Sequence, residues 1–167
     1  MDIDPPRPLN MHDDVSHFDC GVSSLNTWLQ NHAWKNQQTG VSRTNVICTR
    51  PEGRIAGFVS MSTAVMERAA LPRRDRHGKP DPIPLTLLGQ LAVDRHHTGR
   101  SLGRSLLFFA LKTALAMSEH IGSYGVLTHP VNTAARSFYL HYGFEDIPHD
   151  ERGGMLLRMQ DIRAAGF

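Results

Sequence analysis

Several residue types and patterns are scarce in this chain of 167 residues, and each scarcity argues against a class of protein. Only two cysteines occur, with no Cys-x-x-Cys pair, which argues against a disulfide framework and a zinc knuckle. No apolar run approaches the roughly 18 residues that a membrane span requires. The first ten residues are acidic and proline-rich, unlike a secretory signal. We therefore expect a soluble cytoplasmic protein that does not associate with membranes.

Lysine is also scarce, because only three of the 18 basic residues are lysines and the others are arginines. The formal net charge of +2 hides an uneven distribution along the chain. Residues 1–30 sum to −4, residues 31–110 to +7 and residues 111–167 to −1. A basic middle suggests an anionic ligand. On composition alone, a solvated arginine-rich surface is the simpler explanation.

Hydrophobic periodicity predicts one α/β domain over residues 1–167, in which residues 1–17 form an extended lead-in. One helix is expected between a cap at Ser23 or Ser24 and Gly40, and further helices over 101–117 and 131–142. Strands are expected over 45–49, 55–66, 85–93 and 123–128, from 144 onward, and over 155–159. This order predicts a mixed, mostly antiparallel central sheet flanked by helices.

Two stretches of this pattern differ from their neighbours. Residues 67–84 are rich in proline, glycine and charge, which predicts a long loop that is functional or mobile. The strand over 85–93 is almost continuously apolar, which predicts a central strand buried on both faces.

The join between this central strand and the next helix carries the strongest chemical signal, Thr98-Gly99-Arg100-Ser101-Leu102-Gly103-Arg104. The free N–H groups and the positive dipole end of a helix form a cradle that suits a pyrophosphate. Arg100 and Arg104 add charge, and the two glycines permit close approach. Alone the loop is a weak signal, neither a Walker loop nor a dinucleotide fingerprint, and an ordinary capped turn explains it equally.

A second motif runs from Asn132 to Phe144. Asn132 can cap the helix that follows, and Phe138 and Tyr142 lie four residues apart, as core residues would. Tyr139 lies on a different face, where its phenol is a candidate general acid for a leaving thiolate. On the residues alone, a half-buried packing tyrosine is the simpler explanation.

Together the two motifs resemble those of the GNAT acetyltransferase family. Residues 98–103 align with its pattern Q/R-x-x-G-x-G/A, with Thr98 and Ser101 replacing the leading Gln/Arg and the middle Gly. The second pattern, N-x-x-A-x-x-F-Y-x-x-x-G-F, is matched in full from Asn132 to Phe144.

Two further segments are similar to those of the GNAT toxins of toxin–antitoxin operons. They are Phe18-Asp19-Cys20-Gly21, followed by Leu25-Asn26-Thr27-Trp28-Leu29, and the strand Leu88-Gly89-Gln90-Leu91-Ala92-Val93-Asp94. The similarity runs from about Phe18 to Met159.

The resemblance implies a GNAT fold and transfer of acetyl from acetyl-CoA to the α-amine of aminoacyl-tRNA, which blocks translation. It implies a homodimer held inactive by a ribbon-helix-helix antitoxin. Tyr139 would protonate the leaving CoA thiolate. The implied cofactor-binding residues are Leu91, Ala92, Val93, Thr98, Gly99, Arg100, Ser101, Leu102, Gly103, Arg104 and Asn132.

The resemblance suggests that the basic segment 31–110 binds tRNA, because arginine can contact both the phosphates and the bases of an acceptor stem. The predicted tRNA contacts are Arg73, Arg74, Arg76, Lys79 and Arg95. Asp94 and Glu67 are candidates for a general base by position only. The histidines lack metal-ligand spacing, so no metal is expected, and Cys20 and Cys48 are expected to be small buried apolar residues.

Two other functions compete with this interpretation. One is a GNAT enzyme that acetylates a small amine or a protein N-terminus. The other is a non-catalytic domain that binds RNA or a partner on the same scaffold, an alternative that the departures at Thr98 and Ser101 leave open.

Overall fold

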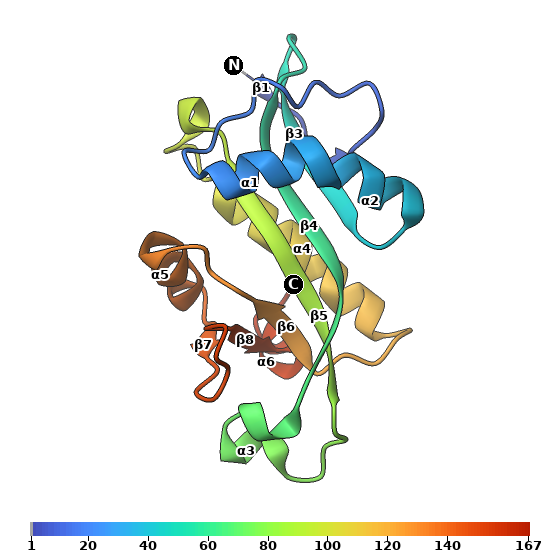
Figure 1. The fold of residues 1–167 in the computed structure, drawn as a ribbon, viewed down its shortest axis with the longest axis vertical. Coiled ribbons are helices and arrows are strands. Elements are labelled where there is room, and N and C mark those ends of the chain that lie inside the picture. Colours follow the sequence, from blue (N-terminus) through green and yellow to red (C-terminus); the bar gives the residue numbers. More distant parts are fainter. Residues whose placement is uncertain (1) are drawn as a thin grey trace. The chain divides into compact units, whose positions relative to one another are not determined.

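The computed structural model describes residues 2–167 and divides into two compact units. Unit 1 comprises the residues up to Ser62 together with Leu88–Ala110, and unit 2 comprises Thr63–Leu87 together with Leu111–Phe167. By these bounds, three elements that are labelled in Figure 1 have residues in both units: strands β4 (Ile55–Met66) and β5 (Ile83–Val93) and helix α4 (Leu102–Ser118). The predicted α/β class, with helices flanking a central sheet, is confirmed.

The sheet of unit 1 has the strand order β1 (Asp2–Ile3), β3 (Arg43–Arg50), β4 and β5, and β2 (Arg7–Pro8) also pairs with β3. Strands β1, β2 and β4 all pair with β3 in the antiparallel sense. The predicted extended lead-in therefore adds two short strands to the sheet. The predicted bounds of β4 are those observed.

The helix expected before Gly40 forms in three pieces: α1 (Ser23–Trp28), the π-helical turn η1 (Leu29–Ala33) and α2 (Trp34–Thr39). Gly40 ends it at φ 78°, as predicted. The predicted serine cap is wrong, because Val22 is the N-cap and no side chain bonds to the free N–H groups. The apolar face of these helices packs on Phe58 of β4, whose ring lies 6.0 Å from that of Trp28 and 5.3 Å from that of Phe18.

Helix α4 approaches β4 within unit 1 at Gly57. A Cβ at this position would lie 2.9 Å from Leu106 and 3.1 Å from the carbonyl oxygen of Ala92. Only glycine allows this approach, which leaves Leu106 fully buried. Strand β5 is central, as predicted, but it is not buried on both faces, because Gly89 is exposed and Leu91 and Val93 are half-buried.

The sheet of unit 2 continues from β5 to β6 (Gly125–Thr128), β8 (Met155–Arg158) and β7 (Glu145–Asp146). Strand β8 pairs with both neighbours in the antiparallel sense. Helix α5 (Thr133–His141) lies where a helix was predicted, and α6 (Met159–Ala164) is an addition. The core of the unit is a buried cluster of Leu71, Ile83, Leu85, Leu127, Ile147 and Leu156.

The stretch 67–84 is not the irregular loop that its composition predicts. It contains the 3-10 turn η2 (Arg68–Ala70) and the short helix α3 (Arg73–Arg76), and β5 begins within it at Ile83. The reason is burial, because Leu71 and Ile83 are fully buried.

Smaller corrections concern single side chains. Phe138 and Tyr142 are half-buried rather than in the core. Cys48 is buried, as expected, whereas Cys20 is only partly so. None of the helices within residues 2–167 combines the length and the apolar character that a membrane span needs.

Candidate active site

The predicted pyrophosphate loop lies in unit 1, between the end of β5 and the start of α4. The 3-10 turn η3 (Arg95–His97) follows Asp94, and residues 98–101 then lead into the helix. Thr98, Gly99, Arg100 and Ser101 are all exposed. The free N–H groups at the start of this 17-residue helix therefore face an accessible loop.

The backbone of this loop turns at two residues in the left-handed region. Gly99 has φ 78° and Ser101 has φ 59°. Ser101 is the only non-glycine residue with positive φ in the described part of the chain. It therefore adopts the conformation that the glycine of the family pattern would take, and the substitution leaves the turn in place. No atom lies within 4 Å of a Cβ built on Gly99, so space for a ligand remains.

The two arginines of the loop differ in their surroundings. The guanidinium of Arg104 lies 4.9 Å from the centre of the Phe108 ring, one turn further along α4. Arg100 is exposed, and it has no ion-pair partner among residues 2–167. Open space, free N–H groups and an unpaired arginine together fit the diphosphate of a coenzyme.

The end of β5 supplies the residues predicted to bind the pantetheine arm. Ala92 packs into the core of unit 1, while Leu91 and Val93 are half-buried because alternate side chains of a strand point to opposite faces. Gly103 is half-buried and Leu102 is buried in the first turn of α4.

Asp94 is a structural carboxylate at this point. It is buried, and it accepts hydrogen bonds from the backbone N–H groups of Asp19 at 3.0 Å and of His96 at 2.9 Å. Burial raises the pKa of the Asp94 carboxyl, but these hydrogen bonds and the His96 ring together bring it below the ordinary value. A carboxylate so stabilised is a poor proton acceptor, which weakens Asp94 as a candidate base.

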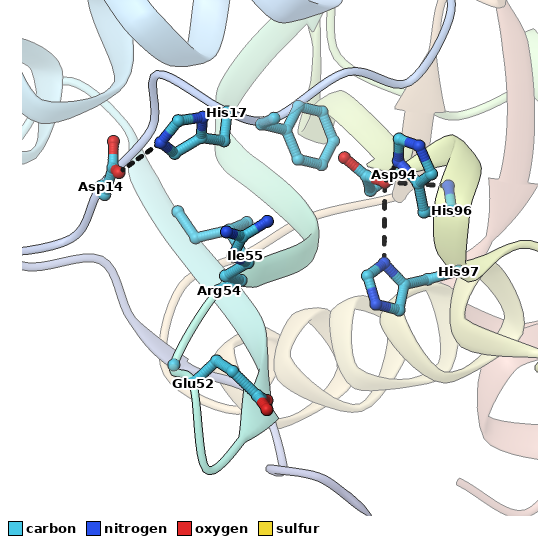
Figure 2. Close-up of a pocket in the computed structure, with 10 residues that line it drawn as sticks. Asp14, His17, Glu52, Arg54, Ile55, Asp94, His96 and His97 are labelled. Atoms are coloured by element: carbon cyan, nitrogen blue, oxygen red, sulfur yellow. Dashed lines mark hydrogen bonds and ion pairs between the residues drawn. The ribbon is translucent and has the colours of Figure 1, made fainter. Parts of the chain in front are cut away.

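A cavity of about 500 Å³ opens beside Asp94 in unit 1 (Figure 2). Figure 2 shows His97 directed at the Asp94 carboxylate, and its Nδ1 lies 3.6 Å from Oδ1, which is too long for a hydrogen bond. Phe18 and Ile55 supply apolar wall, and the remaining lining is polar: Asp14, His17, Glu52, Gly53, Arg54 and His96.

Tyr139 lies in unit 2 on α5 and is 5% exposed. Its ring packs edge-on against Phe138 at 5.3 Å and against Phe144 at 5.2 Å. Burial raises the pKa of the phenol to about 12, although a hydrogen bond with Thr128 at the end of β6 acts to lower it. The phenol is therefore protonated at neutral pH, as a proton donor must be.

Asn132 caps α5, as predicted. Its side-chain oxygen accepts a hydrogen bond from the N–H of Ala135 at 2.8 Å. The residue is exposed, so its amide NH₂ group remains accessible.

The four predicted tRNA-contacting residues of the 67–84 stretch lie in unit 2 with different partners. Arg73 is exposed, and Arg74 pairs with Glu145. Arg76 is half-buried and donates to the carbonyl oxygen of Leu71 at 2.8 Å. Lys79 lies 5.2 Å from the centre of the Tyr124 ring. In unit 1, the 63%-exposed side chain of Arg95 lies 3.2 Å from the Asp19 carboxylate.

Helix α3 is held in place by a buried carboxylate that no sequence motif indicates. The carboxylate of Asp75 accepts two hydrogen bonds from Arg158, at 2.5 and 2.7 Å, and a third from the Tyr124 hydroxyl. Asp75 is 1% and Arg158 6% exposed. Asp75 stands in a polar stretch and its partner is 83 residues away, so no local signal marks the pair.

The second candidate for a general base is Glu67. Glu67 is exposed and precedes η2, where its carbonyl oxygen accepts from Ala70 at 3.0 Å. Over residues 2–167, no three His, Cys, Asp or Glu side chains are placed to hold a metal ion.

Comparison with known proteins identifies relatives of the whole chain. The sequence model of the acetyltransferase (GNAT) domain matches residues 42–146. A protein of Mycobacterium tuberculosis (strain ATCC 25618 / H37Rv) named tRNA-acetylating toxin is 40% identical, over 95% of this chain and 94% of its own length.

Two solved structures are similar over nearly the full length. AtaT complexed with acetyl-methionyl-tRNAfMet is 25% identical with a TM-score of 0.90, over 99% of this chain and 100% of that one. AtaTR bound with AcCoA is 26% identical with a TM-score of 0.86, over 99% of both chains.

Proposed function

Because the chain belongs to the GNAT acetyltransferase family, we propose that it is a toxin that acetylates the α-amine of aminoacyl-tRNA and so blocks translation. The observation that carries this proposal is the 40% identity to the tRNA-acetylating toxin along 95% of the chain. The 25% identical neighbour in complex with acetyl-methionyl-tRNAfMet supports the same acceptor. Acetyl-CoA supplies the acetyl group as an activated thioester.

The residues of unit 1 bind and orient acetyl-CoA in this reaction. The N–H groups at the start of α4, with the turn through Gly99 and Ser101 and the charge of Arg100, hold the pyrophosphate. Thr98 and residues 102–104 complete this loop. Backbone groups of residues 91–93 align the pantetheine arm and polarise the thioester carbonyl.

The residues of unit 2 donate a proton and bind the acceptor tRNA. Tyr139 gives its phenolic proton to the departing sulfur, and Asn132 contacts the coenzyme arm through its free NH₂ group. Arg73 and Arg74 on α3 bind acceptor-stem phosphates, with support from Arg76 and Lys79. Arg95 of unit 1 adds a further contact.

The proposal extends to the assembly and location of the protein. Residues 1–167 act as one functional domain, and the enzyme forms a homodimer in the cytoplasm. Its activity is held in check by a ribbon-helix-helix antitoxin. A small open reading frame of that type next to the gene would support the toxin assignment.

Radiolabel transfer from acetyl-CoA tests the substrate directly. We expect label in aminoacyl-tRNA and none in the same tRNA after deacylation. Label in polyamines or peptide N-termini, with none in charged tRNA, would assign the other GNAT substrates. Binding of tRNA without any transfer would assign the non-catalytic scaffold.

A further inference from the structure

Glu145 of β7 forms an ion pair that the proposed function does not explain. Its Oε2 accepts one hydrogen bond from Nη2 of Arg74 on α3 and another, at 3.0 Å, from Nη2 of Arg158. The side chain of Arg74 is 63% exposed and that of Glu145 46%, so solvent reaches the pair. A carboxylate of unit 2 therefore already engages a guanidinium of the same unit that we assign to an RNA phosphate.

Arg158 holds the Glu145 carboxylate in this position. The arginine is itself fixed, because it is buried and donates two hydrogen bonds to Asp75. Strand β7 brings Glu145 close to it, since Glu145 pairs with Leu156 of β8, two residues before Arg158. The hydrogen bond from Arg158, with help from Arg74, keeps the pKa of Glu145 below its ordinary value although burial acts to raise it. The carboxylate is therefore charged at neutral pH.

The three arginines of α3 differ in what they contact. Arg73 is exposed, and it has no ion pair or side-chain hydrogen bond within residues 2–167. Arg76 donates to the carbonyl oxygen of Leu71. Arg74 is the one of the three whose guanidinium donates to a carboxylate in this part of the chain. An incoming phosphate can therefore reach Arg73 directly, whereas it must displace Glu145 from Arg74.

A carboxylate and a phosphate bind a guanidinium in the same way, because both offer oxygens to its planar array of N–H donors. Such an exchange is accessible at Arg74, since an exposed ion pair contributes little free energy. Glu145 keeps its hydrogen bond to Arg158 when a phosphate takes Arg74. The exchange therefore leaves neither the carboxylate nor the buried arginine without a partner.

We propose that Glu145 is an internal competitor of RNA, which occupies the phosphate position of Arg74 in the free protein and is displaced when RNA binds. This inference rests on the proposed binding of tRNA through α3. The displaced carboxylate stays beside Arg74 and competes with the phosphate. Glu145 therefore weakens the complex and favours release of the RNA.

Filter binding of deacylated tRNA to the full chain tests the proposal. Glu145→Gln should tighten binding about threefold to fivefold, the upper range for an exposed ion pair. The same change should have no effect in an Arg74→Ala background and its full effect in an Arg73→Ala background. The glutamine oxygen can still accept from Arg158, so α3 should stay in place, and urea titration checks this.

Asp146→Asn is the matched control. It removes the same charge from the next residue of β7, but Asp146 pairs with Arg136 of α5 and not with α3. We expect its tRNA affinity to stay within about 1.5-fold of wild type, because salt screens an exposed charge that does not contact Arg74.

Unchanged or weaker tRNA binding by Glu145→Gln would overturn the proposal. A gain that persists in the Arg74→Ala background, or that Asp146→Asn reproduces, would also overturn it, because a general loss of negative charge predicts that result. Failure of the proposed function is a separate outcome. The wild-type protein would then place no label in charged tRNA, whereas these comparisons measure only the binding of deacylated tRNA.

Discussion

Tyr139 combines deep burial with a hydrogen bond between its side chain and Thr128 at the end of β6. Packing against Phe138 and Phe144 fixes the position of the ring. The hydroxyl is therefore the only group of this side chain that we expect to react. Because the pKa of the phenol is raised to about 12, the group can donate a proton at any physiological pH.

Tyr139→Phe should therefore remove acetyl transfer while leaving coenzyme binding unchanged. We expect kcat to fall at least 100-fold, the loss typical of a missing general acid, because the ring and its contacts are retained. Growth arrest and label transfer measure activity, and calorimetry measures acetyl-CoA affinity. Tyr142→Phe, at the C-cap of the same helix, is the control and should behave as wild type. Undiminished toxicity of Tyr139→Phe would instead favour a binding module.

Ser101 carries the backbone strain of the pyrophosphate loop. A non-glycine residue at φ 59° costs about 1–2 kcal/mol relative to the right-handed region. Ser101→Gly relieves that strain and so raises the free energy of unfolding. It also increases the conformational entropy of the unfolded chain, which offsets about half of that increase.

We expect Ser101→Gly to raise the free energy of unfolding by about 0.5–1 kcal/mol, measured by urea titration. Ser105→Gly, four residues later inside α4, should lower it by about 1 kcal/mol. Equal losses in both variants would contradict the strain assigned to Ser101.

At the scale of secondary-structure elements, α3 depends on one buried ion pair. A four-residue helix is too short to be stable alone, so Asp75 and its bond to Arg158 at the end of β8 keep α3 in place. The hydrogen bonds from Arg158 lower the pKa of Asp75 despite its burial. The arginines on either side of Asp75 therefore lie on a helix whose position is fixed by this ion pair.

Asp75→Asn should cost on the order of 3 kcal/mol, because it leaves Arg158 buried with less compensating charge. The contribution of Asp75 depends on pH in a defined direction. Its pKa is lower in the folded state, so the stabilisation is present above about pH 4 and is lost as the pH falls through the folded pKa.

The free energy of unfolding, measured from pH 7 to pH 2, tests this pH dependence of the stabilisation by Asp75. The wild type should lose stability faster than Asp75→Asn below pH 4. Asp161→Asn, at an exposed carboxylate 3.8 Å from the same arginine, is the control and should follow the wild-type curve.

At the scale of the whole molecule, charge is separated along the chain. The +7 of residues 31–110 covers the pyrophosphate loop and the arginines of α3, and the two ends offset it to +2. A near-neutral total is therefore compatible with a polyanionic substrate, because binding depends on local charge.

The double variant Arg73→Ala/Arg74→Ala should weaken tRNA binding and reduce its salt dependence. The slope of log affinity against log salt should shrink by about 1 for each phosphate that the variant no longer neutralises. Filter binding at several salt concentrations measures this, with acetyl-CoA affinity as a check on the fold. Lys112→Ala/Arg163→Ala removes the same charge elsewhere in unit 2 and should keep the wild-type slope.

Much of the fold was predictable because it depends on neighbours in sequence. The bounds of β4, the end of a helix at Gly40 and the Asn132 cap follow from local conformational preference and hydrogen bonding. The motif from Asn132 to Phe144 is likewise local, so Tyr139 could be named without coordinates.

The sequence by itself determined the α/β class, the family and the candidate acid, since period and motif are properties of adjacent residues. Tertiary structure alone decided which residues distant in sequence come into contact and how their surroundings change their pKa values. Asp75, for example, meets Arg158, which lies 83 residues further along the chain. The pKa of Tyr139 depends on what surrounds it. Burial and electrostatics act between residues that folding brings together, and no spacing along the chain encodes those distances.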